Sequence, residues 1–120
     1  MEKFSFDIEN EQAGVFAATL VGMIEPSIYD ENETRRLAGL IVHCWLETGH
    51  RKANLIFSKG GRQTLTEAEA NALLILMRWY EWPSLYWLSN IYTKLDLFIT
   101  NTQGMRQVDS QRRRMENIKQ

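Results

Sequence analysis

Residues 64–99, TLTEAEANALLILMRWYEWPSLYWLSNIYTKLDLFI, decide the fold of this 120-residue chain. Thr66 followed by Glu69 is typical of a capping box, in which the two side chains satisfy free backbone N–H groups at a helix start. Every position from 72 to 77 is apolar, which indicates a helix buried on all sides. Pro83 lacks a backbone N–H and must stop or kink that helix. We therefore predict a buried central helix at about 66–81, followed by a hinge at 82–84.

A second amphipathic helix is predicted after the hinge. Ser84 is a suitable N-cap, and large apolar residues then recur at spacings of three and four, which is the helical period. They are Leu85, Leu88, Tyr92, Leu95 and Ile99. Residues 100–103 read as a break. A last, weakly apolar helix is predicted beyond it from Met105, Val108, Met115 and Ile118.

Small residues mark the first predicted helix. Asn10 is a candidate N-cap for a helix at 11–25, which Pro26 ends. Gly14, Ala18 and Gly22 follow one another at spacings of four. A face of small residues favours close packing against another helix, or against a second copy of the chain.

Another helix is predicted between this one and the central helix. Asp30 and Glu33 form a capping signal, and the helix is expected to run to about residue 48, with Gly49 just past its end. Its predicted inner face consists of Leu37, Ile41, Cys44, Trp45 and Thr48, broadened by Leu40.

Two segments fit a helix less clearly. Residues 3–8, KFSFDI, alternate apolar and polar side chains as a strand does, but no second strand offers to pair with them. Because an isolated strand is not stable, we expect an extended arm or a lead-in to the first helix. Leu55, Ile56 and Phe57 fit a strand or one helical turn. A short helix is favoured there, ended by Gly60 and Gly61 and followed by a polar loop.

The fold expected from these patterns is all-α: a compact single-domain bundle of four to six helices. A helical body covers 1–103, and a basic C-terminal helix or tail of the same domain covers 104–120. The single cysteine excludes an intrachain disulfide and suits a reducing compartment. The N-terminus has no apolar signal-peptide core, and no apolar run reaches the roughly 18–20 residues that a membrane span needs. We expect a cytoplasmic protein without membrane contact.

The candidate chemical sites are weak. His43, Glu47 and His50 fall on one helical face and carry metal-binding groups, but Gly49 interrupts that face. Cys44 has no base beside it, because His43 points about 100° away on a helix. The sequence carries no glycine-rich phosphate loop and no nucleophile elbow. We therefore expect neither enzyme activity nor a metal or other cofactor, and keep a metal-dependent enzyme as the least favoured alternative.

Two basic clusters support a nucleic-acid-binding regulator as the alternative function. One consists of Arg51, Lys52, Lys59 and Arg62, beside His50, and the other lies at 106–119. Either cluster would contact phosphates in a salt-dependent manner. The net charge of −1 is unlike that of a dedicated nucleic-acid binder.

The leading hypothesis is a non-enzymatic protein-interaction module: a small regulator, adaptor or inhibitor, of the kind that phages and mobile elements encode. Five aromatic residues lie within 78–87, and such residues concentrate in interfaces as well as in cores. A protein partner is therefore expected, and homodimerisation through the hinge or the small-residue face is a further expectation. The predicted partner-binding residues are Trp79, Trp82, Tyr86, Trp87, Arg112, Arg113 and Arg114.

Overall fold

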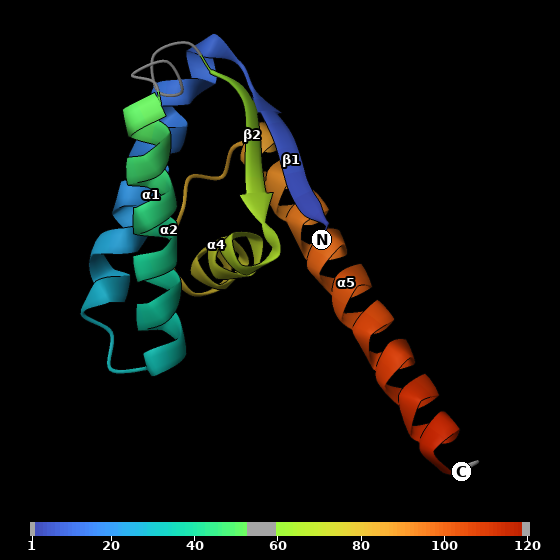
Figure 1. Cartoon of the computed structure of the whole chain (residues 1–120). Helices are drawn as coiled ribbons and strands as arrows, with labels where there is room; N and C mark the ends of the chain where they lie inside the picture. The colour runs from blue at the N-terminus through green and yellow to red at the C-terminus, as the bar shows by residue number, and fades with distance from the viewer. Residues whose placement is uncertain (1, 53–59, 119–120) are drawn as a thin grey trace.

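The computed structural model describes residues 2–52 and 60–118, with side chains described at 2–48 and 60–103. Over this part of the chain four α-helices and a two-stranded sheet form one compact, mostly helical domain (Figure 1). The elements are β1 (Lys3–Ile8), the 3-10 turn η1 (Asn10–Gln12), α1 (Ala13–Ile28), α2 (Glu33–Lys52), β2 (Gly61–Thr66), α4 (Glu67–Trp79) and α5 (Tyr86–Ile118). The short helix expected around Leu55 lies outside the described residues.

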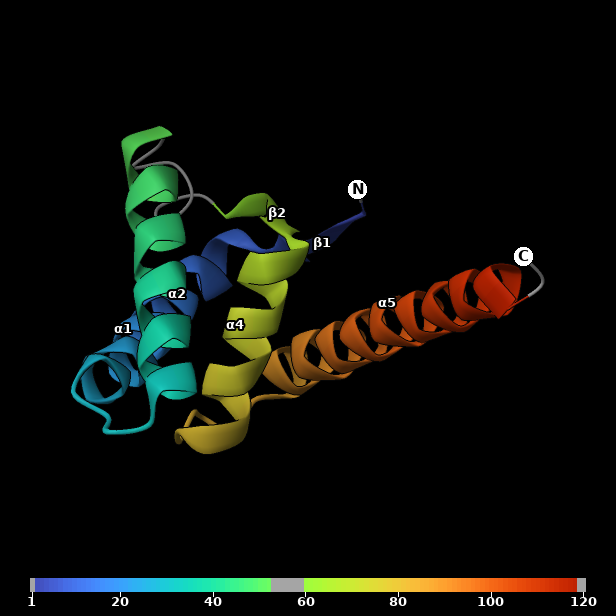
Figure 2. The same ribbon diagram turned by 60° about the horizontal axis from the view of Figure 1, so that its bottom comes forward.

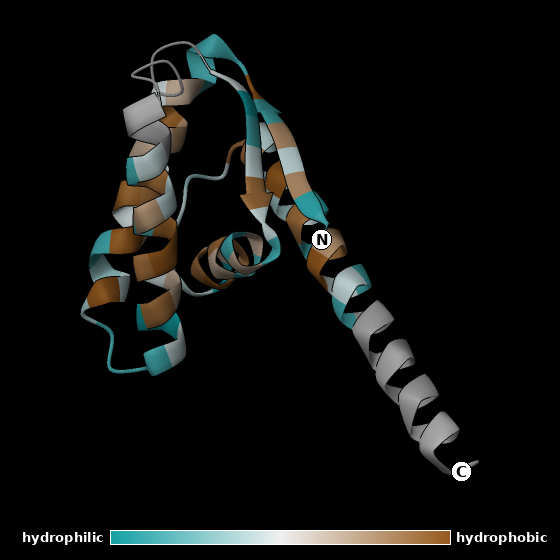
Figure 3. Cartoon of the chain, viewed as in Figure 1, coloured by the Kyte–Doolittle hydropathy of each residue, from teal (hydrophilic) through white to brown (hydrophobic). Residues whose placement is uncertain are grey.

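The sheet makes the all-α prediction wrong. β1 pairs with β2 in an antiparallel register that places Ser5 opposite Thr64 and Phe6 opposite Gln63. Apolar and polar positions alternate along β1 (Figure 3), and its apolar side chains, Phe4, Phe6 and Ile8, are buried. The partner strand lies where a polar loop was expected. Its one large apolar side chain, Leu65, is completely buried.

The central helix is confirmed as α4. Thr66 accepts a hydrogen bond from the backbone N–H of Glu69, and the Glu69 side chain accepts one from Thr66 N–H, as the capping box requires. The helix lies between the α1–α2 pair and the face formed by the sheet and α5 (Figures 1 and 2). Its buried side chains are Ala70, Ala72, Leu73, Leu74, Leu76 and Met77. Helical structure is interrupted between Trp79, where α4 ends, and Tyr86, where α5 begins, as Pro83 predicts.

Helices α1 and α2 run antiparallel (Figure 1), and their ends differ from the predicted ones. Pro26 lies inside α1 but only in its last turn, so few backbone hydrogen bonds remain for the ring to disturb. Asn32 caps α2, because its Oδ1 accepts from the backbone N–H of Arg35 at 3.0 Å. Gly49 does not end α2, which continues to Lys52.

Close packing of α1 on α2 is centred on Gly39, not on the predicted small-residue face of α1. Gly14, Ala18 and Gly22 are exposed, and a Cβ on either glycine would meet open space. That packing prediction is therefore wrong. A Cβ on Gly39 would instead overlap the Oγ of Ser27 and lie 2.8 Å from its Cβ. Ser27 itself is fully buried and donates to the Ile24 carbonyl at 2.6 Å.

Helix α5 is continuous through the predicted break at 100–103. Its first half packs on the body through the buried side chains of Leu88, Ile91, Leu95 and Ile99. Beyond this contact the helix projects away from the domain as an arm (Figures 1 and 2). Among the described residues, no helix combines the length and apolar character that a membrane span requires.

Candidate interaction surface

Helix α2 turns a row of large aliphatic side chains toward solvent. Leu37, Leu40 and Ile41 are 49%, 45% and 38% exposed, and Cys44 is exposed as well. The predicted inner face of this helix is therefore wrong except at Trp45, which is partly buried against the core. The buried face instead carries Ala38, Gly39 and Val42, because small residues allow the close approach to Ser27. The larger residues are left on the outside.

Leu37 and Ile41 also form part of one wall of a groove between α2 and α4, which we call the α2–α4 groove. Its volume is about 230 Å³, and it is lined by Thr34, Leu37, Ala38 and Ile41 from α2 and by Ala68, Asn71, Ala72 and Ile75 from α4. On the α4 side two of the four lining residues are alanines, whose short side chains leave the helix backbone close to the groove. The groove is therefore an open, mainly apolar trough between two helices.

An aromatic and cationic pair lies beside one end of this groove. Trp79 lies one turn beyond Ile75 on α4 and is 64% exposed. The guanidinium of Arg35, in the first turn of α2, lies 4.5 Å from the centre of the Trp79 ring. Such a stacked cation and ring attract each other. Tryptophan and arginine are also the residues most often found at the energetic centres of protein interfaces.

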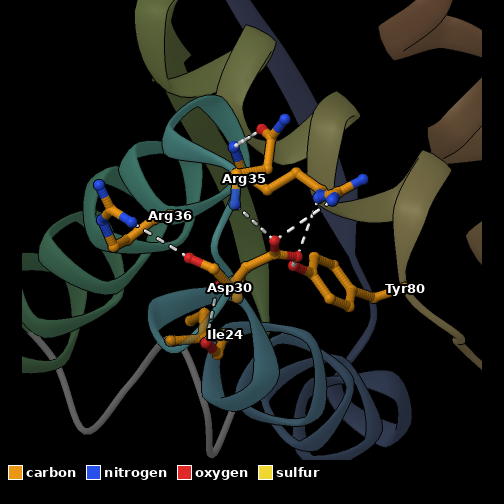
Figure 4. Close-up of polar contacts among 7 residues, drawn as sticks. Ile24, Asp30, Arg35, Arg36 and Tyr80 are labelled. Atoms are coloured by element: carbon orange, nitrogen blue, oxygen red, sulfur yellow. Dashed lines mark hydrogen bonds and ion pairs between the residues drawn. The ribbon is translucent and has the colours of Figure 1, made fainter.

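Arg35 is held in this position by Asp30, in the loop between α1 and α2 (Figure 4). Its Nε lies 2.8 Å from the Asp30 carboxylate, and Tyr80 donates its hydroxyl to the same carboxylate at 2.5 Å. The hydrogen bond from Tyr80, followed by that from Asn32 N–H and the pairing with Arg35, lowers the pKa of Asp30 to about 2. Burial, followed by the hydrogen bond to Asp30, raises the pKa of Tyr80 to about 12. The charged Asp30 therefore holds the Arg35 guanidinium against the face of the Trp79 ring.

The four predicted partner-binding aromatic residues do not share one surface. Trp82 and Trp87 are partly buried against the core, and Trp82 Nε1 donates to the Met77 carbonyl at 2.7 Å. Trp79 and Tyr86 are exposed, Tyr86 to 83%. Arg112, Arg113 and Arg114 lie on the distal part of α5, outside the described side chains. Partner binding by this set stays a prediction.

The residues of the two alternative functions are placed only in part. His43 Nε2 lies 3.2 Å from Glu47 Oε1 in an exposed pair, and His50 lies outside the described side chains. Where side chains are described, no group of three or more histidine, cysteine or acidic residues is arranged to hold a metal ion. Of the first basic cluster, Arg62 is exposed on β2, whereas Arg51, Lys52 and Lys59 lie outside the described side chains.

Sequence reasoning missed the α2–α4 groove as a site. Leu37 and Ile41 were assigned to the core, and Arg35, Ala68 and Ile75 to no site. The sequence does carry a signal for this exposed surface. Residues 37–46 of α2 are almost all apolar, so apolar side chains extend around most of the helix. Such an arc is wider than one helix contact covers.

Comparison of the chain with protein-family models, with curated proteins and with solved structures gives no match. The functional argument therefore starts from the geometry of the chain itself. Among the described residues, the strongest candidate for an interaction surface is the α2–α4 groove, because Leu37 and Ile41 are exposed along one of its walls.

Proposed function

We propose that this protein is a non-enzymatic interaction module, a small regulator, adaptor or inhibitor, that binds an amphipathic helix of a protein partner in the α2–α4 groove. The observation that carries the proposal is the exposure of Leu37 and Ile41 across the groove from Ala68 and Ala72 of α4. A third helix laid along two neighbouring helices buries such a trough with side chains at i, i+3, i+4 and i+7.

The shape of the trough favours a helix as the occupant. Ala68 and Ala72 are short enough for a helix backbone to approach α4, and Leu37 and Ile41 supply apolar contacts on the other side. Helices pack at axial distances of roughly 8–10 Å, set by the side chains at the contact. The occupant would then be a third helix of a small bundle, supplied by the partner.

The Trp79–Arg35 pair is needed for useful affinity. Leu37 and Ile41 are 49% and 38% exposed, so complete burial of what remains of both contributes only roughly 1–3 kcal/mol. Association costs an estimated 4–15 kcal/mol in lost motion, so the aliphatic contacts alone give weak binding. Trp79 offers a large ring that is already positioned by Arg35, which reduces the ordering cost. We expect an acidic or aromatic residue of the partner helix to contact this pair.

A pull-down with matched variants tests the proposal. Tagged wild-type protein, Ile41→Asp and the control Val21→Asp are incubated with lysate of the source cells, with and without nuclease and at low and high salt. Retained proteins are identified by mass spectrometry. Val21 is also exposed, but it lies on α1. We expect a stoichiometric protein partner on wild type and Val21→Asp, and at least tenfold less of it on Ile41→Asp.

Two results would contradict the proposal. The first is equal retention of the partner by wild type and Ile41→Asp, because the α2–α4 groove would then not be the binding surface. The second is retention that vanishes with nuclease and falls steeply with salt, which would favour the nucleic-acid alternative. A dimer of the purified protein that Ile41→Asp dissociates would assign the groove to a second copy instead of a partner.

A further inference from the structure

The two-stranded sheet has a free outer edge on β1. In an antiparallel pair, alternate residues turn their N–H and C=O groups away from the neighbouring strand. The β2 residues that do so can be recognised, because Thr64 O accepts from Trp45 Nε1 and Thr66 N–H donates to Glu69. Their partners in the register are Ser5 and Lys3. The outward groups of β1 are therefore those of Lys3, Ser5 and Asp7.

The two outer edges of the sheet differ in how many of their outward backbone groups are hydrogen-bonded. On β2 the outward carbonyl of Thr64 is occupied by the indole of Trp45, at 3.2 Å. On β1 no described residue donates to or accepts from the outward backbone groups of Ser5 or Asp7. An unpaired strand edge is a template for pairing with another chain. The outer edge of β1 retains that capacity at Ser5 and Asp7, whereas on β2 the Thr64 carbonyl and the Thr66 N–H are already engaged.

A groove runs along this edge, between β1 and the first half of α5. It has a volume of about 300 Å³ and is lined by Ser5, Phe6, Asp7, Glu9 and Gln12 on one side and by Trp87, Asn90, Ile91 and Lys94 on the other. This is the lower end of the range for ligand pockets. We call it the β1–α5 groove. Its floor offers apolar contact from Ile91 and Trp87, and its rim offers free backbone groups.

The charges of the groove indicate the chemistry of its occupant. Asp7 and Glu9 bring two carboxylates to the end of β1, whereas Lys94 is the one cation among the lining residues. Neither Asp7 nor Lys94 has an ion-pair partner among the described residues. A basic side chain on the occupant would therefore be attracted to Asp7 and Glu9.

We propose that the β1–α5 groove binds an extended peptide segment of a partner, which adds as a third strand to the outer edge of β1. The peptide backbone pairs with Ser5 and Asp7. Alternate apolar side chains of the peptide point into the groove over Trp87 and Ile91, and a basic side chain faces Asp7 and Glu9. This site is separate from the α2–α4 groove, and neither proposal rests on the other.

The test begins with a phage-displayed library of random nonapeptides, selected on the full-length protein. We expect selected peptides to alternate apolar and polar residues and to carry a lysine or arginine. Synthetic copies are then titrated by fluorescence polarisation. Two sets of peptides are then N-methylated, one at the odd and one at the even positions. Only one set should lose binding, because only alternate N–H groups of the peptide point toward β1.

Matched protein variants locate the site. Ser5→Pro removes the outward N–H without taking a hydrogen bond from the β1–β2 pair and is expected to weaken binding about fivefold to tenfold. Ser5→Ala loses the hydroxyl contact with Thr64 but keeps the N–H, and should bind as wild type does. Asn90→Trp fills the groove from an exposed position on α5, and Ser89→Trp, on the same turn but outside the lining, is its control.

The outcomes separate clearly. Loss of binding in Asn90→Trp, with retention in Ser89→Trp and Ile41→Asp, supports strand addition even where Ser5→Pro fails to fold. Failure to select any peptide overturns the proposal. So does the selection of peptides that tolerate N-methylation at every position, or that bind Asn90→Trp as well as they bind Ser89→Trp.

Discussion

Tyr80 donates its hydroxyl to the carboxylate of Asp30 at 2.5 Å, across 50 residues of chain. Asp30 belongs to the loop between α1 and α2, and Tyr80 follows the last turn of α4. The hydrogen bond therefore joins the α1–α2 pair to the end of the central helix. Because Asp30 also holds Arg35 at 2.8 Å, this contact connects the packing of the domain to the Trp79 end of the α2–α4 groove.

Acid should weaken the domain through Asp30. The folded state favours the ionised carboxylate and lowers its pKa from 3.8 to about 2. The resulting stabilisation is complete above about pH 4 and is lost as the pH falls toward 2. We expect the difference in unfolding free energy between wild type and Asp30→Asn to be constant from neutral pH to pH 4 and to shrink below it. An unchanged difference near pH 2 would contradict this assignment.

Alkali should act through Tyr80. The folded state favours the protonated phenol and raises its pKa from 10.0 to about 12. This contribution is therefore complete below about pH 10 and is lost as the pH rises through 12. The phenolate absorbance of wild type minus that of Tyr80→Phe isolates this one group, and its midpoint is expected near pH 12. A midpoint near 10 would mean that Tyr80 is neither buried nor hydrogen-bonded to Asp30 in solution.

The orientation of α2 can be tested with neighbouring residues. Val42 is buried and Ile41 lies at the groove. Val42→Ala removes buried methyl groups and should lower the free energy of unfolding by about 2 kcal/mol. Ile41→Ala should cost less than about 1 kcal/mol. Denaturant unfolding measures both, and the reverse order would show that the helix presents its other face to the core.

The contact between Gly39 and Ser27 predicts opposite effects of one substitution at two glycines. Gly39→Ala forces its new methyl group into Ser27 and should destabilise the protein by roughly 1–3 kcal/mol. Gly22→Ala places the methyl group in open space on α1 and should stabilise it by about 0.5–1 kcal/mol, because alanine favours the helix. Thermal unfolding of both variants checks the pair. Equal effects would mean that the helices are not in close contact at Gly39.

Removal of the arm should leave the body folded. The buried residues of α5 end at Ile99 among those described, and the helix then projects from the domain (Figure 1). A chain ending at Gln103 is expected to unfold cooperatively with little loss of stability and a smaller hydrodynamic radius. Circular dichroism and size-exclusion chromatography measure these properties. Loss of cooperative unfolding would show that residues 104–120 stabilise the core.

Local patterns predicted the central helix well, because its signals are close in sequence. Thr66 and Glu69 are three residues apart, and the apolar run follows at once. The orientation of α2 could not be predicted in the same way. Apolar residues occupy most of its circumference, so its periodicity allows several inner faces. The face with Gly39 turns to the core because Ser27 of α1 packs closely there, and the sequence does not show that Ser27 is the neighbour of Gly39.

The sheet was missed for a related reason. Residues 61–66, GRQTLT, contain one large apolar residue, so the segment has the composition of a loop. It becomes a strand because β1 supplies three buried apolar side chains opposite it. The α2–α4 groove could not be predicted either, because its exposed aliphatic wall depends on which face of α2 packs against the core.

The pairing of β1 with β2 also has a consequence for the order of folding. Ser5 and Thr64 are 59 residues apart, so the sheet closes a long loop, and contacts of large sequence separation form slowly. During synthesis β1 emerges before the described helices of this domain, and β2 follows only after α1 and α2. The apolar side of β1 is therefore unprotected throughout that interval. We expect β1 to be among the last elements of the domain to reach its native place.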